Sequence, residues 1–443
     1  MHILCADMQS KLSQERKKPA SYLRPGTIMN LKREETEALR ALAHEYMEIA
    51  SLPIQREKME LWKAFNRHDN TRPMVLIDQL PWNELNRDGE LTCLSQDPFL
   101  RGAELQLRET IYKWKHFPAD MVVEPFLTIP YSATNSGCGI RIDEDVAMTD
   151  ATNSVVSHAY KNQLNDEEDL EKIQSKKITL NREQSAEWLE TAKYIFDGIL
   201  PVRQAGGVTI HHLGIWDSLA MFMGVEDIYF DLMDRPEFIH KIMEKMTDSY
   251  LAGIRQVNEL GLFDTSANTC HCSVIYNDEQ LPDFGAGQGN DTHHGWAFGM
   301  AQLFTSVSPD VTAEFEVPYI SRMAEEFQMI YYGCCDRLDD RLDIVQKIPK
   351  VRKMSCSPWS DREAFAERLR KDIIMSNKPT PAYLAVNDMN YDEIAADLKR
   401  TCNAAKKNGV ALEMILKDIS TVRYQPERLT KWAECAMKVV ESY

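Results

Sequence analysis

Several motifs that would place a protein at once in a well-known class are missing from this 443-residue sequence. There is no Gly-x-Gly-x-x-Gly turn after a strand-like segment and no P-loop, so nothing favours a nucleotide-binding fold. There is no Gly-x-Ser-x-Gly segment, so serine hydrolase chemistry has no support. No apolar run is long enough to span a membrane, and residues 1–18 do not resemble a signal peptide. We therefore expect a cytoplasmic protein that does not associate with membranes.

The sequence also has fewer basic than acidic residues. Lys and Arg total 51 against 68 Asp and Glu, which gives a formal net charge of -17. Binding to a phosphate backbone requires a basic face, so nucleic acid is not an expected partner. The ten cysteines show no small-domain disulfide framework, and in a chain of this length they fit a reducing compartment.

The chain begins with a segment that has helical periodicity. Apolar residues between Glu34 and Ser51 recur at helical spacing, and a second helix begins near Met59. We interpret residues 1–71 as an N-terminal helical extension and residues 72–443 as the main domain. The extension can serve as a lid, a partner surface or a dimer arm, so a homodimer is one expected arrangement.

From Arg72 onward, short strand-like runs alternate with helical stretches, as in repeated β/α units with a parallel sheet. Eight such units predict a (β/α)8 barrel of the TIM type, with a doubly wound open sheet as the alternative. The eight predicted strands are Met74–Asp78, Asp120–Leu127, Val208–Leu213, Ser266–Cys272, Met329–Cys334, Lys353–Ser357, Asp372–Ser376 and Leu412–Leu416.

Two connections between the predicted strands are unusually long, at residues 137–200 and 273–319. The second contains a glycine-rich run, Phe284–Gly295, which includes His293 and His294. Long insertions in compact domains often act as lids or binding loops, so we expect this run to lie near a ligand. A solvent-exposed histidine pair is the simpler interpretation of His293 and His294.

Chemically competent side chains follow the predicted strands, where the residues of a barrel face one shared mouth. Asp78, Glu124 and Asp418 are candidates for general acid or base catalysis, or for binding a hard metal ion. Carboxylates at strand ends are equally often solvated or paired with Arg and Lys, and this alternative stays open. We predict that these three are catalytic residues.

Two segments offer soft metal ligands, Cys270-His271-Cys272 and Cys334-Cys335-Asp336. Zinc accepts sulfur, imidazole nitrogen and carboxylate oxygen, and a catalytic zinc site keeps one position open. Each cysteine alone is better explained as a small buried residue, but the cluster as a whole favours a metal. His271, Cys334 and Cys335 are the candidate metal ligands within these two segments.

Other strand-end residues suggest a pocket for a small molecule. Trp82, Trp216 and Trp359 can shape an aromatic wall, although each alone fits core packing equally well. His212 and Lys378 follow the third and seventh predicted strands and add polar groups. We predict that these five residues contact the substrate.

Taken in order, the strand-end motifs resemble those of the uroporphyrinogen decarboxylase-like superfamily. The resemblance runs from about Arg72 to the C-terminus. The motifs are Arg72–Gln79, Asp120–Pro125, Val307–Pro309 leading to Glu314 and Phe315, Tyr331–Asp336, Arg352–Trp359 and Leu416–Thr421. This resemblance implies a (β/α)8 barrel and an enzyme. It also implies one of two activities, which the motifs themselves do not separate.

Cofactor-free decarboxylation of a porphyrinogen is the first activity. Its members carry an arginine-rich turn after the first strand that pairs with substrate carboxylates. The corresponding turn here is Asp78-Gln79-Leu80-Pro81-Trp82, which has no arginine and begins with an acid. An acidic residue there would repel a polycarboxylate, so we do not expect porphyrinogen decarboxylation.

The second activity is zinc- and corrinoid-dependent methyl transfer, a reaction of anaerobic metabolism. In one branch a His-x-Cys pair and a later cysteine bind zinc, and the positions here that correspond are Tyr332, Cys334 and Asp418. The sequence more closely resembles the aryl methyl ether O-demethylase branch, whose zinc ligands are more varied. This resemblance adds Glu314, so that the candidate metal ligands are His271, Glu314, Cys334 and Cys335. We therefore expect a methyltransferase that moves a methyl group from a small methylated substrate to a corrinoid protein, with zinc in the barrel and cobalamin on the partner.

Two alternatives stay open at this stage. One is a metal-free decarboxylase or lyase that acts on a non-porphyrin substrate through Asp78 and Glu124. The other is a barrel that binds a ligand or a corrinoid protein without catalysis. The resemblance does not identify the substrate.

Overall fold

A parallel β-sheet lies at the centre of the computed structural model, which describes residues 31–148, 157–265, 267–278 and 290–443. The sheet has six strands in the order β1-β14-β13-β12-β11-β10, and every neighbouring pair is parallel. These strands are β1 (Met74–Ile77), β10 (Trp296–Gly299), β11 (Met329–Tyr332), β12 (Val351–Cys356), β13 (Ile374–Asn377) and β14 (Leu412–Leu416).

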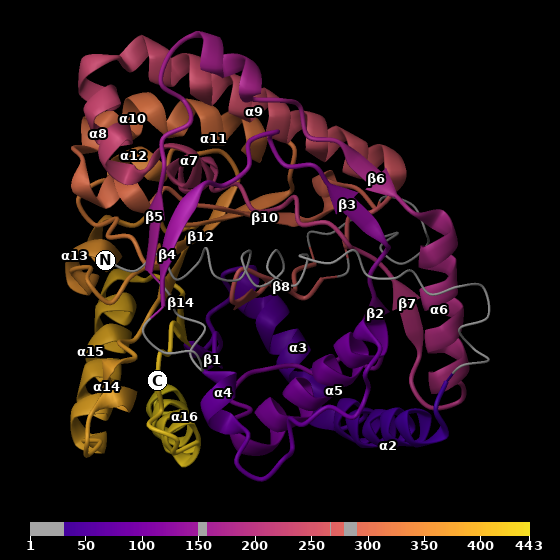
Figure 1. Cartoon of the computed structure of the whole chain (residues 1–443). Helices are drawn as coiled ribbons and strands as arrows, with labels where there is room; N and C mark the ends of the chain where they lie inside the picture. The colour runs from indigo at the N-terminus through magenta and orange to yellow at the C-terminus, as the bar shows by residue number, and fades with distance from the viewer. Residues whose placement is uncertain (1–30, 149–156, 266, 279–289) are drawn as a thin grey trace.

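Helices lie around the sheet (Figure 1). They are α2 (Arg33–Ala50), α3 (Pro53–Asn66), α4 (Trp82–Leu85), α5 (Pro98–His116), α6 (Arg182–Phe196), α7 (Ile215–Met223), α8 (Val225–Asp234), α9 (Pro236–Leu260), α10 (Pro309–Phe315), α11 (Val317–Ala324), α12 (Leu342–Val345), α13 (Arg362–Arg368), α14 (Ala382–Ala385), α15 (Tyr391–Asn408) and α16 (Glu427–Val440). No helix in the described ranges is long and apolar enough to cross a membrane.

Smaller elements fill the connections between these helices and strands. In the described parts of the chain, short 3-10 helices span Glu168–Lys172, Thr292–His294 and Gln302–Ser306. The remaining strands pair two by two, β2 (Leu127–Ile129) with β7 (Val202–Gln204), β3 (Ala133–Asn135) with β6 (Ile178–Leu180), β4 (Glu144–Ala147) with β5 (Ser157–Tyr160), and β8 (Thr269–Cys270) with β9 (Ser273–Val274). Only β2 and β7 run parallel to each other.

The structure confirms an α/β fold with a parallel sheet, but it corrects the predicted strands. Five of the eight predicted segments contain strands of the central sheet. Asp120–Leu127 and Val208–Leu213 do not form strands over their length, and His212 makes only an isolated parallel bridge to Phe298 of β10. The segment Ser266–Cys272 contributes the antiparallel strand β8 instead of a sheet strand. Among the described residues the continuous ladder therefore holds six strands.

One strand of the sheet was missed from the sequence. Strand β10 lies inside the stretch 273–319 that was predicted to be a long connection. Its four residues, Trp-Ala-Phe-Gly, include two small residues and are too few to show a period. Tertiary packing decides the conformation here, because all four residues are buried beside β11.

Alternate residues of the sheet strands face two different apolar layers, as the two-residue period of a strand requires. In β1, Val75 and Ile77 join the large core beneath the outer helices, whereas Met74 and Leu76 join a small inner cluster. In β11, Ile330 and Tyr332 face the outer core, and Tyr331 faces a second inner cluster that includes Cys334. Cys334 therefore lies on the inner side of the sheet.

Helix α3 covers part of this inner side. Trp62 and Phe65 pack with Met74 and Leu76, and the Trp62 ring nitrogen donates to the Asp120 carbonyl oxygen at 2.8 Å. The predicted extension therefore contacts the sheet directly. The division of the chain into an extension, residues 1–71, and a main domain, residues 72–443, stays a prediction.

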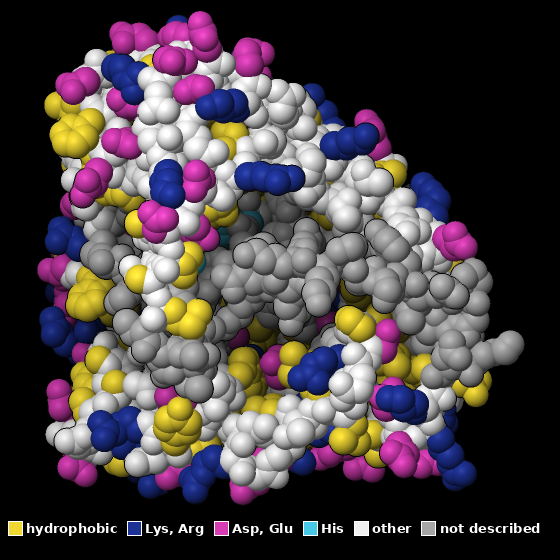
Figure 2. Space-filling model, viewed as in Figure 1, with side chains coloured by type: hydrophobic (Ala, Val, Ile, Leu, Met, Phe, Trp, Pro, Cys, Tyr) yellow, Lys and Arg dark blue, Asp and Glu magenta, His cyan; other side chains and the backbone are white. Residues whose placement is uncertain are grey.

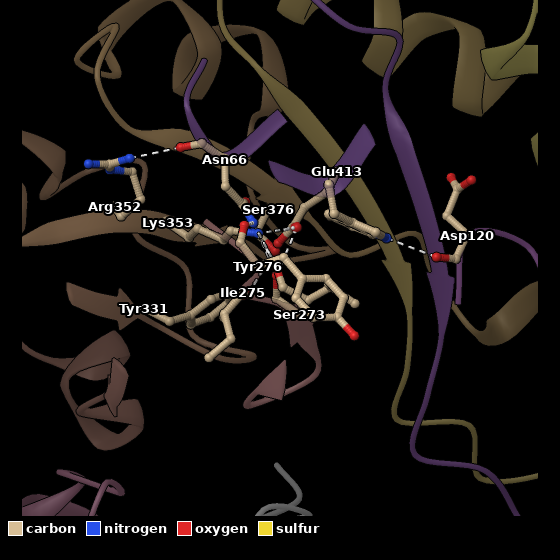
Figure 3. Close-up of polar contacts among 12 residues, drawn as sticks. Asn66, Asp120, Ser273, Ile275, Tyr276, Tyr331, Arg352, Lys353, Ser376 and Glu413 are labelled. Atoms are coloured by element: carbon tan, nitrogen blue, oxygen red, sulfur yellow. Dashed lines mark hydrogen bonds and ion pairs between the residues drawn. The ribbon is translucent and has the colours of Figure 1, made fainter. Parts of the chain in front are cut away.

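A buried ion pair lies on the same inner side, between β12 and β14. Lys353 Nζ is 2.8 Å from Glu413 Oε2, and both side chains have zero exposure. The Ser273 hydroxyl donates to the same carboxylate oxygen, and Lys353 also donates to this hydroxyl and to the Val274 carbonyl oxygen (Figure 3). The sheet is thus fastened to the β8–β9 hairpin by charged hydrogen bonds.

Candidate active site

A cavity of about 390 Å³ lies beside the carboxyl end of β1. Its walls come from β1, from the segment 121–128, from β7, from residues 264–274 and from helices α2 and α5. Figure 2 shows that the viewed face of the molecule is hollowed and that acidic and basic side chains gather around it. Ligand sites commonly have volumes of roughly 300–1,000 Å³, so the cavity suits a small molecule.

Two of the three predicted catalytic carboxylates, Asp78 and Glu124, line this cavity together. Burial raises the pKa of Glu124 to about 7, although a hydrogen bond from Tyr276 and the charge of Arg203 oppose the shift. A carboxyl group with this pKa can give or take a proton near neutral pH. Asp78 is more exposed, and its Oδ1 lies 3.5 Å from Lys113 Nζ.

Arg203 of β7 forms the opposite side of the cavity. Its guanidinium lies 3.7 Å above the Phe126 ring and donates to Thr128 Oγ1 at 2.9 Å. It also lies 4.0 Å from Asp264, another residue of the cavity wall. The cavity therefore contains two cations and three acids, and each cation is close to a carboxylate.

The third predicted catalytic residue, Asp418, belongs to a neighbouring group of polar side chains that we name the Lys417 cluster: Lys417, Asp418, Cys334, Cys335 and His271. Lys417 Nζ lies 3.0 Å from Cys334 Sγ, 3.1 Å from His271 Nε2 and 3.4 Å from Asp418 Oδ2. Cys335 Sγ donates to Asp418 Oδ2 at 2.8 Å and lies 3.5 Å from Cys334 Sγ.

The backbone is strained where it delivers these side chains. His271 and Asp418 have φ values of 57° and 56°, and Gln79, which follows the cavity residue Asp78, has a φ of 50°. Residues other than glycine rarely adopt such angles, and they cluster at functional sites when the surrounding structure imposes them. The His271 ring is held in place by Phe298, which stacks on it with centroids 3.9 Å apart.

Cys272 links the cluster to the cavity, because it lines the cavity wall and follows His271 in the chain. Burial tends to raise the pKa of the Cys272 thiol, but the positive charges of His271, Lys378 and Lys417 outweigh burial and lower it. A soft nucleophile and a proton donor, Cys272 and Glu124, thus share one cavity.

The four predicted metal ligands do not come together. His271, Cys334 and Cys335 lie in the Lys417 cluster, but Glu314 lies on α10 with its side chain 59% exposed and faces His240 at 3.4 Å. Within the described ranges, no group of three or more His, Cys, Asp or Glu side chains is arranged to hold a metal ion. The donor types suit zinc, but the Lys417 ammonium occupies the space between them, so the residues as placed do not fit the metal.

The predicted substrate-contacting residues also lie in different places and do not form one site. His212 lies beside the cluster, and burial, followed by the charges of His211 and His271, lowers its pKa to about 4. Lys378 is buried and donates to Tyr331 and Ser376. Trp216 is fully buried against Phe304, whereas Trp82 is partly buried and packs against Tyr112.

Trp359 is 75% exposed, which places it outside the cavity and the cluster. The first half of the glycine-rich run Phe284–Gly295 lies outside the described residues. Of its histidines, His294 bonds to Asp291 at 2.8 Å, and His293 lies 3.8 Å from Glu326. The predicted lid stays a prediction.

The sequence placed Lys417 and Cys272 at strand ends, with Cys272 in a segment offering metal ligands, but the predicted site residues include neither of them, nor Arg203 or Tyr276. Lys417 and Cys272 each adjoin a selected residue, so their position at strand ends was a usable signal. Arg203 and Tyr276 had no such signal, since they reach Glu124 from segments distant in the sequence.

Comparisons with known proteins add little to this geometry. No family model matches the sequence, and no curated protein matches it. Among solved structures, the chain is similar to a methyltransferase from Methanosarcina mazei, with 11% sequence identity and a TM-score of 0.49. That likeness covers 86% of this chain and 98% of the other. It is too weak to assign a fold or an activity.

Proposed function

We propose that this protein is a methyltransferase of the uroporphyrinogen decarboxylase-like superfamily, which moves a methyl group from a small methylated substrate to a corrinoid protein. An aryl methyl ether is the substrate class that the strand-end motifs favour. The proposal includes a closed (β/α)8 barrel. Two bonds at the sheet edges support closure: His212 bridges to β10, and the Asp120 amide donates to the Val75 carbonyl oxygen of β1 at 3.0 Å.

The main support for the proposal is the position of Glu124 in the wall of the cavity. A methyl ether is a poor methyl donor, because the departing oxygen would leave as an anion. Glu124, with a pKa of about 7, can donate its proton to that oxygen while the carbon–oxygen bond breaks. The corrinoid, when bound, supplies the nucleophile that accepts the methyl group.

The other cavity residues would orient the substrate. Arg203 and Lys113 can donate to an acidic substituent on the substrate, and Phe126 adds an apolar wall. The cavity volume of about 390 Å³ suits a single substituted ring. Zinc is expected from the resemblance alone and is not part of this proposal, because the predicted ligand Glu314 faces His240 and lies apart from the other three.

A direct assay tests this proposal. The protein would be incubated without oxygen with a methoxylated benzoate and free cob(I)alamin, which stands in for the partner, and loss of the cob(I)alamin absorbance would be followed. We expect methyl transfer by the unmodified protein and a fall of roughly 10²–10⁴-fold for Glu124→Gln, the usual contribution of a general acid.

Glu363→Gln is the matched control, since Glu363 is an α13 surface residue paired with Arg400. It should transfer methyl groups at the unmodified rate. The proposal fails if the unmodified protein transfers no methyl group, or if Glu124→Gln is as active as Glu363→Gln.

A metal-free decarboxylase or lyase is the second candidate, and the two cations of the cavity favour it. Arg203 and Lys113 could hold a substrate carboxylate, while Glu124 or Asp78 protonates the carbanion left after carbon dioxide departs. Release of labelled carbon dioxide from small aromatic acids, without any corrinoid, would identify this activity. Binding of such acids without turnover would indicate the non-catalytic barrel.

A further inference from the structure

The Lys417 cluster has the composition of a metal site but has an ammonium group at its centre. Cys334 Sγ, His271 Nε2 and Asp418 Oδ2 all lie 3.0–3.4 Å from Lys417 Nζ. The Lys417 side chain is 1% exposed. A thiol, an imidazole and a carboxylate thus converge on one buried positive charge.

Zinc and this ammonium cannot share the space. Zinc binds sulfur at about 2.3 Å and imidazole nitrogen at about 2.0–2.1 Å, so it would lie among the same three atoms. Lys417 Nζ would then be well within 4 Å of a divalent cation, inside a protein where like charges repel strongly. The His271 ring cannot easily turn elsewhere, since it is stacked on Phe298 and approaches Tyr331.

We propose that Lys417 supplies the positive charge of this cluster in place of a metal ion, so that Cys334, Cys335 and His271 hold no divalent metal in the native protein. The ammonium neutralises the cluster and fixes the positions of the Cys334 and His271 side chains through hydrogen bonds. It also prevents His271 and the two thiols from closing on one ion. This inference opposes the zinc expected from the resemblance and does not depend on the proposed methyl transfer.

Cobalt(II) titration tests the proposal, because cobalt bound to thiolates gives an intense charge-transfer band. The unmodified protein, purified and reduced without oxygen, should show no such band and less than a tenth of an equivalent of zinc. Lys417→Met removes the ammonium at similar volume. It should gain about one cobalt per chain with the band, as expected for a site with three protein ligands.

Lys176→Met is the matched control. Lys176 is another buried lysine, with its Nζ 3.9 Å above the Tyr250 ring and close to the Cys138 thiol. Among the described residues, the groups whose charge shifts the pKa of Lys176 are Tyr250 and Cys138, and they include no histidine and no second thiol. It should bind no cobalt through sulfur. Adding Cys334→Ser to Lys417→Met should abolish the new band.

The proposal is overturned if the unmodified protein binds one equivalent of zinc or cobalt through cysteine. It is also overturned if Lys417→Met and a second variant, Lys417→Gln, both retain the native circular dichroism spectrum yet bind no cobalt. If neither variant folds, the metal content of the unmodified protein after equilibration with zinc decides alone. Methyl transfer is measured separately, so a failure of one proposal leaves the other distinguishable.

Discussion

At the scale of single residues, the proton affinity of Glu124 controls the expected chemistry. Burial holds its pKa at about 7, compared with an ordinary value of 4.5. The proton it would donate is therefore present below pH 7 and lost above it. Methyl transfer should decline as the pH rises through about 7, and the residual activity of Glu124→Gln should lack this decline. A pH profile of both proteins between pH 5.5 and 8.5 checks this. An identical decline in the variant would assign the titration to another group.

The raised pKa of Glu124 also makes the free energy of unfolding depend on pH. Because the folded pKa of Glu124 lies above the unfolded one, its contribution is fully present below pH 4.5 and is lost as the pH rises through about 7. For Glu413 the sign is reversed. Burial tends to raise its pKa, but the charges of Lys353 and Lys378 outweigh burial and lower it, so its contribution is lost as the pH falls through that lowered pKa.

The Lys353–Glu413 pair leads to a second residue-scale prediction. Lys353→Met leaves a buried carboxylate without its partner, which typically costs about 3–5 kcal/mol of unfolding free energy. The double variant Lys353→Met/Glu413→Leu removes both charges and should recover much of that loss. Urea denaturation of the two proteins checks the prediction. If the double variant is no more stable than the single one, the cost does not come from the unpaired charge.

At the scale of elements, the end of β11 depends on Gly333. This residue has a φ of +88°, and a Cβ placed there would lie 2.6 Å from Leu338 Cδ1 and 3.2 Å from Ser355 Cβ. Gly333→Ala should therefore destabilise the protein by about 1–3 kcal/mol through backbone strain and crowding. Thermal or urea unfolding measures the loss.

Gly409, which ends α15, is the matched control for Gly333. Its φ is +61°, but a Cβ there would meet no atom within 4 Å. Gly409→Ala should cost only about 1 kcal/mol, because it meets backbone strain without crowding. Equal losses in the two variants would show that crowding at the end of β11 is unimportant.

Some helices and strands can be predicted from local sequence signals, and others cannot. Strands β1 and β11 are continuous apolar runs, β14 is apolar except for Glu413, and α15 has an asparagine N-cap and a glycine stop, so local signals predict them. Strand β10 has no such signal. His271 lies in the turn between β8 and β9, but the convergence of Cys334, Cys335 and Asp418 follows from the strand-end rule. The central place of Lys417 does not, because it depends on how four side chains pack together.

At the scale of the whole molecule, the N-terminal helices complete the inner side of the sheet. Tyr46 of α2 lines the cavity, and Asn66 of α3 donates to the Val274 carbonyl oxygen at 3.3 Å. A chain that begins at residue 72 would expose the inner apolar cluster and the Lys353 side chain. We expect it to lose the near-ultraviolet circular dichroism of the full chain and to unfold at lower urea. A fragment with the same unfolding midpoint would show that residues 1–71 are a separable extension.

The pairing of β1 with β14 also affects the order in which the protein can assemble. Ile77 lies opposite Leu416, although almost the whole sequence separates them. At about 5–20 residues per second, a ribosome needs on the order of half a minute to produce β14 after β1 has emerged. During that interval Met-Val-Leu-Ile has no strand to pair with. In the newly made chain β1 therefore stays unpaired with β14 until β14 has emerged, and refolding should be slow because this contact closes so long a loop.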